Sequence, residues 1–164
     1  VIGSATCVEL IDLQLSTPVL ISGVGAVTAQ SAVDNTGSNR QLIRDRLLQG
    51  VPLDAILDEL SGSDAGHGNR QYGMIDTFGD TLTYSGFQNA AWAGGQTGRI
   101  DRGVPGTADD IVYAVQGNIL SGANVVQAAV DALNASNGDL PQMMMEAMQA
   151  AKIAGGDGRC SCSN

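Results

Sequence analysis

Runs of apolar residues at two different spacings divide this chain into short strands and amphipathic helices. Strands are predicted where apolar or β-branched residues run together or alternate between turn residues. The predicted strands are 1–8, 18–21, 23–30, 71–78, 81–85 and 111–115. Helices are predicted where Leu, Ile, Val or Met recur every three or four positions beside capping or stop residues. The predicted helices are 40–49, 52–60, 123–134 and 140–154.

The order of these elements predicts an α/β globular domain with helices outside and sheet inside. Asp139 is placed to cap the last helix, and Gly155-Gly156 is placed to end it. The segment 86–108 has little periodicity and is rich in glycine, so it is predicted to be a long surface loop.

The stretch from Ile111 to Gly122 changes abruptly from a strand to polar residues. A tight turn is predicted at Gln116-Gly117-Asn118, followed by a helix that starts near Ala123. Glycine lets another group approach the backbone closely, and each carboxamide offers a donor and an acceptor. Two interpretations follow: the amides line a ligand site, or they tie a neighbouring loop to the end of the strand.

Composition fits one folded domain over residues 1–164 and excludes some partners. Hydrophobic residues make up 43% of the chain, which argues against disorder. There are 8 basic and 17 acidic residues, for a net charge of -9, so nucleic acid is not expected as a partner. No apolar run reaches the roughly 20 residues that a membrane-spanning helix needs.

Three cysteines lie near the ends of the chain, at Cys7, Cys160 and Cys162. They fit a disulfide between Cys7 and Cys160, or three small buried apolar side chains. His67 is predicted to be a solvated loop residue, and the aspartates at 101, 109 and 110 an exposed acidic loop. No metal site and no cofactor are predicted.

Four sequence blocks carry a resemblance to a known family. They are Gly23–Ser31 (GVGAVTAQS), Arg70–Asp76 (RQYGMID), Tyr113–Asn118 (YAVQGN) and Ala154–Arg159 (AGGDGR). In this order and spacing the chain resembles the family catalogued as domain of unknown function 1028. The resemblance implies an N-terminal nucleophile hydrolase-like fold, a four-layer αββα sandwich. The activity of the family is not established.

The resemblance also implies a disulfide and a location outside the cytoplasm. Some secreted relatives carry two cysteines at positions that Cys7 and Cys160 resemble. The fold's chemistry needs an N-terminal Thr, Ser or Cys whose own α-amine is the base, and Val1 offers neither hydroxyl nor thiol. The family normally has one strand before the position of Val1 and another after the Gly-Asp-x-Arg block. Both strands are expected to be missing from this chain.

Within the implied fold, candidate catalytic residues are amides near strand ends that would stabilise an oxyanion. These are Gln30, Gln116, Gly117 and Asn118. Asp157 and Arg159 add a charge pair that either orients the site or grips a substrate carboxylate, or else locks the end of the chain to the loop.

Three functions compete at this stage. The first is a secreted N-terminal nucleophile hydrolase-like protein, with amide-bond hydrolysis as the expected activity and a small amide or peptide as ligand. The alternative is a non-catalytic, self-associating subunit of a filament or fimbria, because missing strands leave sheet edges open. The third is a binding module of a larger envelope protein. The sequence leaves open whether the protein is an enzyme.

Overall fold

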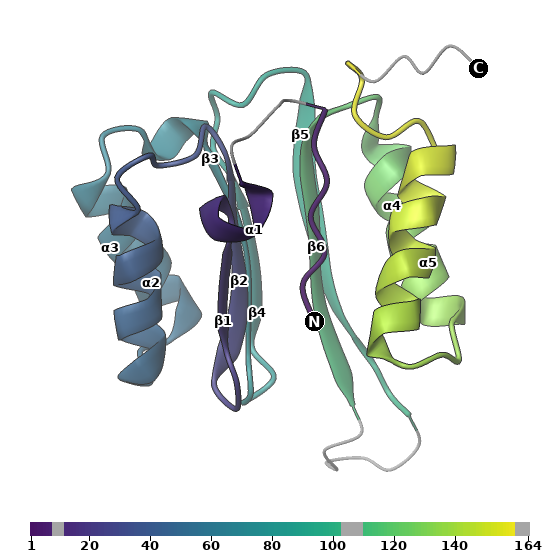
Figure 1. The fold of residues 1–164 in the computed structure, drawn as a ribbon, viewed down its shortest axis with the longest axis horizontal. Helices are drawn as coiled ribbons and strands as arrows, with labels where there is room; N and C mark the ends of the chain where they lie inside the picture. Colours follow the sequence, from purple (N-terminus) through teal and green to yellow (C-terminus); the bar gives the residue numbers. More distant parts are fainter. Residues whose placement is uncertain (8–11, 103–109, 160–164) are drawn as a thin grey trace.

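Two antiparallel sheets form the middle of the molecule, and helices cover the outer face of each (Figure 1). The computed structural model describes residues 1–7, 12–102 and 110–159. Helices α2 (Ser38–Leu48) and α3 (Leu53–Ser63) lie on one side, and α4 (Ala123–Ala135) and α5 (Leu140–Ile153) on the other. The prediction of a mixed α and β domain with its helices outside is confirmed.

The first sheet, sheet A, has the strand order β1-β2-β3-β4. Its strands are β1 (Pro18–Ile21), β2 (Gly25–Ser31), β3 (Arg70–Asp76) and β4 (Thr81–Ser85). Alternate residues point to opposite faces of a strand, so Val27, Tyr72 and Met74 share the face toward α2 and α3. There they pack with Ile43 and Leu60, and all five side chains are buried. Burying each such side chain stabilises the fold by about 1.5–3 kcal/mol.

The second sheet, sheet B, contains β5 (Trp92–Ile100) and β6 (Ile111–Leu120) among the described residues. Helices α4 and α5 cover its outer face with Ala129, Leu133, Met143 and Ala147. Its inner face packs on sheet A, with β6 against β3 and β5 against β4. The polar residues between the two sheets come from β2, β3, β4 and β6.

Strand β5 corrects the prediction of a long loop over 86–108. Its glycines lie where the chain passes close to other groups: a Cβ at Gly95 would be 3.0 Å from Cβ of Thr83 in sheet A. A Cβ at Gly98 would overlap the Tyr113 ring on the neighbouring strand. Glycine inside a strand marks close approach as well as turns, and the sequence alone does not distinguish the two.

Two further expectations at strand ends are wrong. Gln116-Gly117-Asn118 lies inside β6, which continues to Leu120, and does not form a turn. Residues 1–7 form no strand; they run as an extended segment (Figure 1), and a Cβ added at Gly3 would overlap the Met144 side chain of α5. Met is flexible enough to fill the space along such a segment.

The predicted helix boundaries agree with the structure within a few residues. Asp139 caps α5 by accepting a hydrogen bond of 2.9 Å from the backbone N–H of Gln142. Gly155 and Gly156 end this helix with φ of 119° and 54°, values that favour glycine. Two short helical turns, α1 (Leu13–Ser16) and η1 (His67–Asn69), were not predicted.

Candidate functional site

The two sheets bring several strand termini together at one end of the sandwich. Within sheet A, Ser31 at the end of β2 pairs with Arg70 at the start of β3. Within sheet B, Trp92 at the start of β5 pairs with Leu120 at the end of β6. The connection from β4 to β5 crosses between the sheets here (Figure 1, top). We call this end of the sandwich the upper end.

Gln71 is the centre of a hydrogen-bonded cluster at the upper end, and its side chain is completely buried. Its Oε1 accepts hydrogen bonds from Nε2 of Gln30 at 2.8 Å and from Nδ2 of Asn118 at 3.0 Å. Its Nε2 donates to Oγ of Ser85 at 2.7 Å and to the carbonyl oxygen of Gly117 at 2.8 Å. We call these five residues the amide cluster; its bonds join both sheets.

Three of the predicted site residues, Gln30, Gly117 and Asn118, therefore meet through Gln71. The predicted Gln116 lies on the same face of β6, next to this cluster, and its Nε2 donates to Oγ1 of Thr28 at 2.5 Å. Its Oε1 is buried without a hydrogen-bond partner among the described residues. Sequence reasoning missed Gln71, although it occupies a strand position and is polar in a run of buried residues.

The upper end also holds unusual backbone conformations. Within the described ranges, the non-glycine residues with positive φ are Ser31 (73°), Ala91 (55°) and Ile119 (55°). All three lie at or directly next to strand ends, and Ser31 and Ile119 directly follow Gln30 and Asn118 of the amide cluster. Each such residue costs about 1–3 kcal/mol, and such strain is concentrated at functional sites. Ser31 is held by a hydrogen bond from its Oγ to Oδ1 of Asn89 in the loop before β5.

The predicted charge pair of Asp157 and Arg159 is present at the same end. Oδ1 of Asp157 accepts from the backbone N–H of Arg159 at 2.9 Å and from its Nε at 2.8 Å, and Nη2 of Arg159 binds the other carboxylate oxygen. These bonds hold the pKa of Asp157 below its ordinary value. Asp157 forms a β-bridge with Leu120, so the pair is attached to the end of β6.

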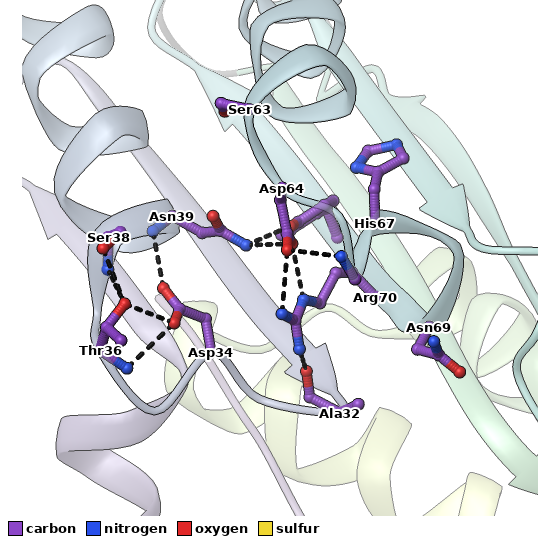
Figure 2. Close-up of polar contacts among 12 residues, drawn as sticks. Ala32, Asp34, Thr36, Ser38, Asn39, Ser63, Asp64, His67, Asn69 and Arg70 are labelled. Carbon is purple, nitrogen blue, oxygen red and sulfur yellow. Dashed lines mark hydrogen bonds and ion pairs between the residues drawn. The ribbon is translucent and has the colours of Figure 1, made fainter.

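A second polar network, which the sequence did not predict, lies between β3 and the helices α2 and α3 that cover sheet A (Figure 2). Arg70 donates to both oxygens of Asp64, from Nε at 2.7 Å and from Nη2 at 3.1 Å. Nδ2 of Asn39 donates to Asp64 at 2.6 Å and to Oη of Tyr72 at 3.1 Å. Arg70 also donates to the carbonyl oxygen of Ala32. The Asp64 and Arg70 side chains are 10% and 16% exposed.

This network sets the ionisation of its members. The hydrogen bond from Arg70 is the largest effect on Asp64, and it holds the pKa of that carboxyl far below its ordinary value. Burial raises the pKa of Tyr72. Because the donors and acceptors of the network satisfy one another, we interpret it as a lock that joins α2, α3 and β3.

His67 lies beside this network and is not solvated as the sequence predicted. Its ring stacks on Tyr84 with 4.3 Å between centroids, and its Nδ1 is buried without a partner among the described residues. Burial is the main cause that lowers the pKa of His67, so the imidazole is neutral at pH 7.

The predicted disulfide falls partly outside the described residues. Cys7 is disulfide-bonded, but Cys160 lies outside the described ranges, so this pairing stays a prediction. Asp109 lies outside them as well. Across residues 1–7, 12–102 and 110–159, no group of three His, Cys, Asp or Glu residues is arranged to hold a metal ion. Over the same residues, no helix has both the length and the hydropathy needed to cross a membrane.

Comparison with known proteins identifies the family of this chain and a solved structure with a similar fold. Residues 1–164 match the model of a family described as a family of unknown function (DUF1028). The structure is similar to the crystal structure of protein SPO2555 from Silicibacter pomeroyi, which is also assigned to that family model, with a TM-score of 0.70 and 19% sequence identity. The match covers 88% of this chain and 58% of that chain. No curated protein matches the sequence.

Proposed function

Since this chain belongs to the DUF1028 family, whose function is unknown, we propose its activity from the upper end of the sandwich. The proposal is an N-terminal nucleophile hydrolase-like protein that hydrolyses amide bonds in a small amide or peptide. The ligand carbonyl would bind beside the amide cluster.

The observation that carries the proposal is that residues with strained backbone conformations and side-chain amide donors lie at the same end of the sandwich. Ser31, Ala91 and Ile119 have positive φ at the upper end, where Gln30 and Asn118 also lie. A fold retains strained residues of this kind where function requires them. The pairing of β5 with β6 is also irregular between Trp92 and Gly94, opposite Asn118 and Ile119, and such bulges are over-represented next to active sites.

The amides have donors to offer an oxyanion. Gln30 and Asn118 each use one N–H on Oε1 of Gln71, and each carboxamide nitrogen carries a second N–H. Both residues are half-buried, whereas Gln71 between them is fully buried. Two donors fixed by a buried partner are pre-organised, and one such donor contributes about 3 kcal/mol to stabilising a transition state.

The nucleophile would be an N-terminal Thr, Ser or Cys that uses its own α-amine as the base. The family resemblance implies another strand before the position of Val1. A strand that formed an antiparallel hairpin with residues 1–7 would start beside Cys7. The backbone N–H of Cys7 donates to Asp157 at the end of β6. Such a nucleophile would thus lie at the upper end, near Asn118.

The test uses the full-length natural protein. It is treated with a β-lactone electrophile, and intact-mass and peptide mass spectrometry locate the adduct, while a panel of acyl-p-nitroanilides and primary amides reports turnover. We expect one adduct on an N-terminal Thr, Ser or Cys. Asn118→Asp should reduce labelling and turnover about 100-fold, and Gln149→Glu on α5 is the matched control. A mature N-terminus without hydroxyl or thiol would exclude this mechanism.

The second candidate function is a non-catalytic subunit that self-associates. It is favoured by the small size of sheet B, where β5 and β6 are both edge strands among the described residues. Unpaired edges favour pairing with another chain. Analytical ultracentrifugation of the full-length protein at several concentrations would separate the candidates, because a monomer at all concentrations argues against assembly.

We also propose a location outside the cytoplasm, where disulfides persist. The disulfide at Cys7 supports this proposal. Non-reducing and reducing peptide maps of protein purified from its natural source would test it, and a free Cys7 thiol in that material would contradict it.

A further inference from the structure

The outer edge of β1 offers backbone groups to a partner. The backbone N–H of Ala29 donates to the carbonyl oxygen of Thr17 at 2.8 Å, directly before the register in which Pro18 pairs with Thr28. Antiparallel pairs alternate between hydrogen-bonded and non-hydrogen-bonded. Leu20, which pairs with Ala26, is therefore a non-hydrogen-bonded position, and its N–H and C=O point away from β2. The carbonyl of Pro18 points the same way.

An open groove follows this edge. It is a shallow groove of about 790 Å³ that is open to solvent. Residues of β1 form one wall, and the start of α2 with the turn before it forms the other. The lining residues used below are Pro18, Val19, Leu20, Ile21, Arg40 and Arg44.

The two faces beside the edge differ in chemistry. Val19 and Ile21 point toward α2, which carries Arg40 and Arg44 at the groove. Leu20 points to the opposite face and is 65% exposed. Nη1 of Arg40 already donates to the carbonyl oxygen of Ser16 at 2.6 Å, so the more exposed Arg44 is the main cation that this groove offers to a partner.

We propose that this groove binds an extended peptide segment of another protein, which adds to β1 as a further strand of sheet A. Its side chains on the α2 face would be carboxylates, one of which meets Arg44, and its alternate side chains would be apolar and cover Leu20. Backbone hydrogen bonds to Leu20 would supply affinity, and the alternating side chains would supply specificity.

Charge argues for an acidic partner and against a second copy at this edge. Two copies joined edge to edge through β1 would place the Arg44 side chains of both on the same side of the extended sheet. The Arg44 side chain is 56% exposed, and among the described residues the acid that it contacts is its neighbour Asp45, at 3.5 Å. It is therefore available to a partner carboxylate. The proposal does not depend on amide-bond hydrolysis.

The experiment measures fluorescence anisotropy of a labelled ten-residue peptide of alternating Glu and Val with the full-length protein. A Lys-Val peptide is the charge control. We expect the Glu-Val peptide to bind, and tenfold weaker binding in Arg44→Glu. Leu20→Pro, which removes the outward N–H at an edge position that tolerates proline, should also weaken binding at least tenfold. Lys152→Glu on α5 makes the same charge change elsewhere and should alter binding less than twofold.

Each other outcome counts against the proposal. Equal binding of both peptides, or equal loss in Lys152→Glu, would overturn the charge argument. Unchanged binding in Leu20→Pro would overturn strand addition, provided that thermal unfolding shows the variant folded. No binding at millimolar peptide would overturn the site itself. A dimer in ultracentrifugation that Leu20→Pro abolishes would assign this edge to a second copy instead.

Discussion

Asn118 of β6 and Gln71 of β3 connect the two sheets through one hydrogen bond, from Nδ2 of Asn118 to Oε1 of Gln71 at 3.0 Å. They are 47 positions apart in sequence and lie on strands of different sheets. Between packed sheets apolar contacts are not directional, whereas an amide pair fixes one relative position. The amide cluster therefore sets the register of sheet A against sheet B as well as forming the candidate site.

Gln71→Ala should destabilise the protein by about 2–4 kcal/mol, because it leaves the carbonyl of Gly117 and the amides of Gln30 and Asn118 without their buried partner. Urea unfolding followed by circular dichroism measures the change. Gln149→Ala, at an exposed position on α5, should change stability by less than about 0.5 kcal/mol. Equal effects of the two substitutions would contradict the role given to Gln71.

Gly73→Ala tests how closely the sheets approach. A Cβ at Gly73 would overlap the carboxamide of Gln116, so the substitution should cost about 1–3 kcal/mol. Shortening the opposing side chain makes room, so Gly73→Ala should cost much less in a Gln116→Ala background. Denaturant unfolding of the four proteins forms a double-mutant cycle. Additive effects would show that the overlap is not the cause. Gly62→Ala, with open space in α3, is the control and should be neutral or stabilising.

Asp64→Asn should destabilise the fold by about 3 kcal/mol at pH 7. The Arg70 side chain is mostly buried, and the substitution removes the carboxylate that neutralises its charge. The ion pair of Arg46 and Glu59 is the control: both side chains are more exposed, so Glu59→Gln should cost less than about 1 kcal/mol.

The same carboxyl should contribute to acid sensitivity. The folded pKa of Asp64 is depressed, so its stabilisation is fully present above the unfolded value, near 3.9, and is lost as pH falls through the folded pKa. Stability measured from pH 6 to pH 2 should therefore decline less steeply in Asp64→Asn than in the natural protein. Parallel curves for the two proteins would show that Asp64 is not the titrating group.

Arg159→Ala distinguishes the two roles of the charge pair at the end of β6. The Arg159 side chain is 39% exposed. If its ion pair with Asp157 has only a structural role, the substitution should lower the free energy of unfolding by less than about 1 kcal/mol. If Arg159 grips a substrate carboxylate, the variant should raise KM about tenfold for substrates with a carboxylate and leave those without one unchanged. Steady-state kinetics on matched acid and primary amide substrates measures the difference.

Much of the fold was determined by local sequence. The spacing of Ile43 and Leu47, the cap at Asp139 and the stop at Gly155 each depend on residues within one or two helical turns. Helix formation responds to such local signals, so these boundaries were predicted correctly. The four blocks that carry the family resemblance also contain four of the five members of the amide cluster, Gln30, Gln71, Gly117 and Asn118.

Tertiary structure alone decided the rest. Gln71 lies at the centre of the site because β3 packs against β6. Arg70 binds Asp64 because the C-terminal end of α3 lies next to the start of β3. The glycine-rich sequence around Gly95 predicts a loop, yet Gly95 lies in a strand. Because it has no side chain, Thr83 of the other sheet can pack close to its backbone. Periodicity records which face of a strand is buried. It does not record what lies opposite, and that partner determines whether a polar or small residue serves a turn, a contact or a site.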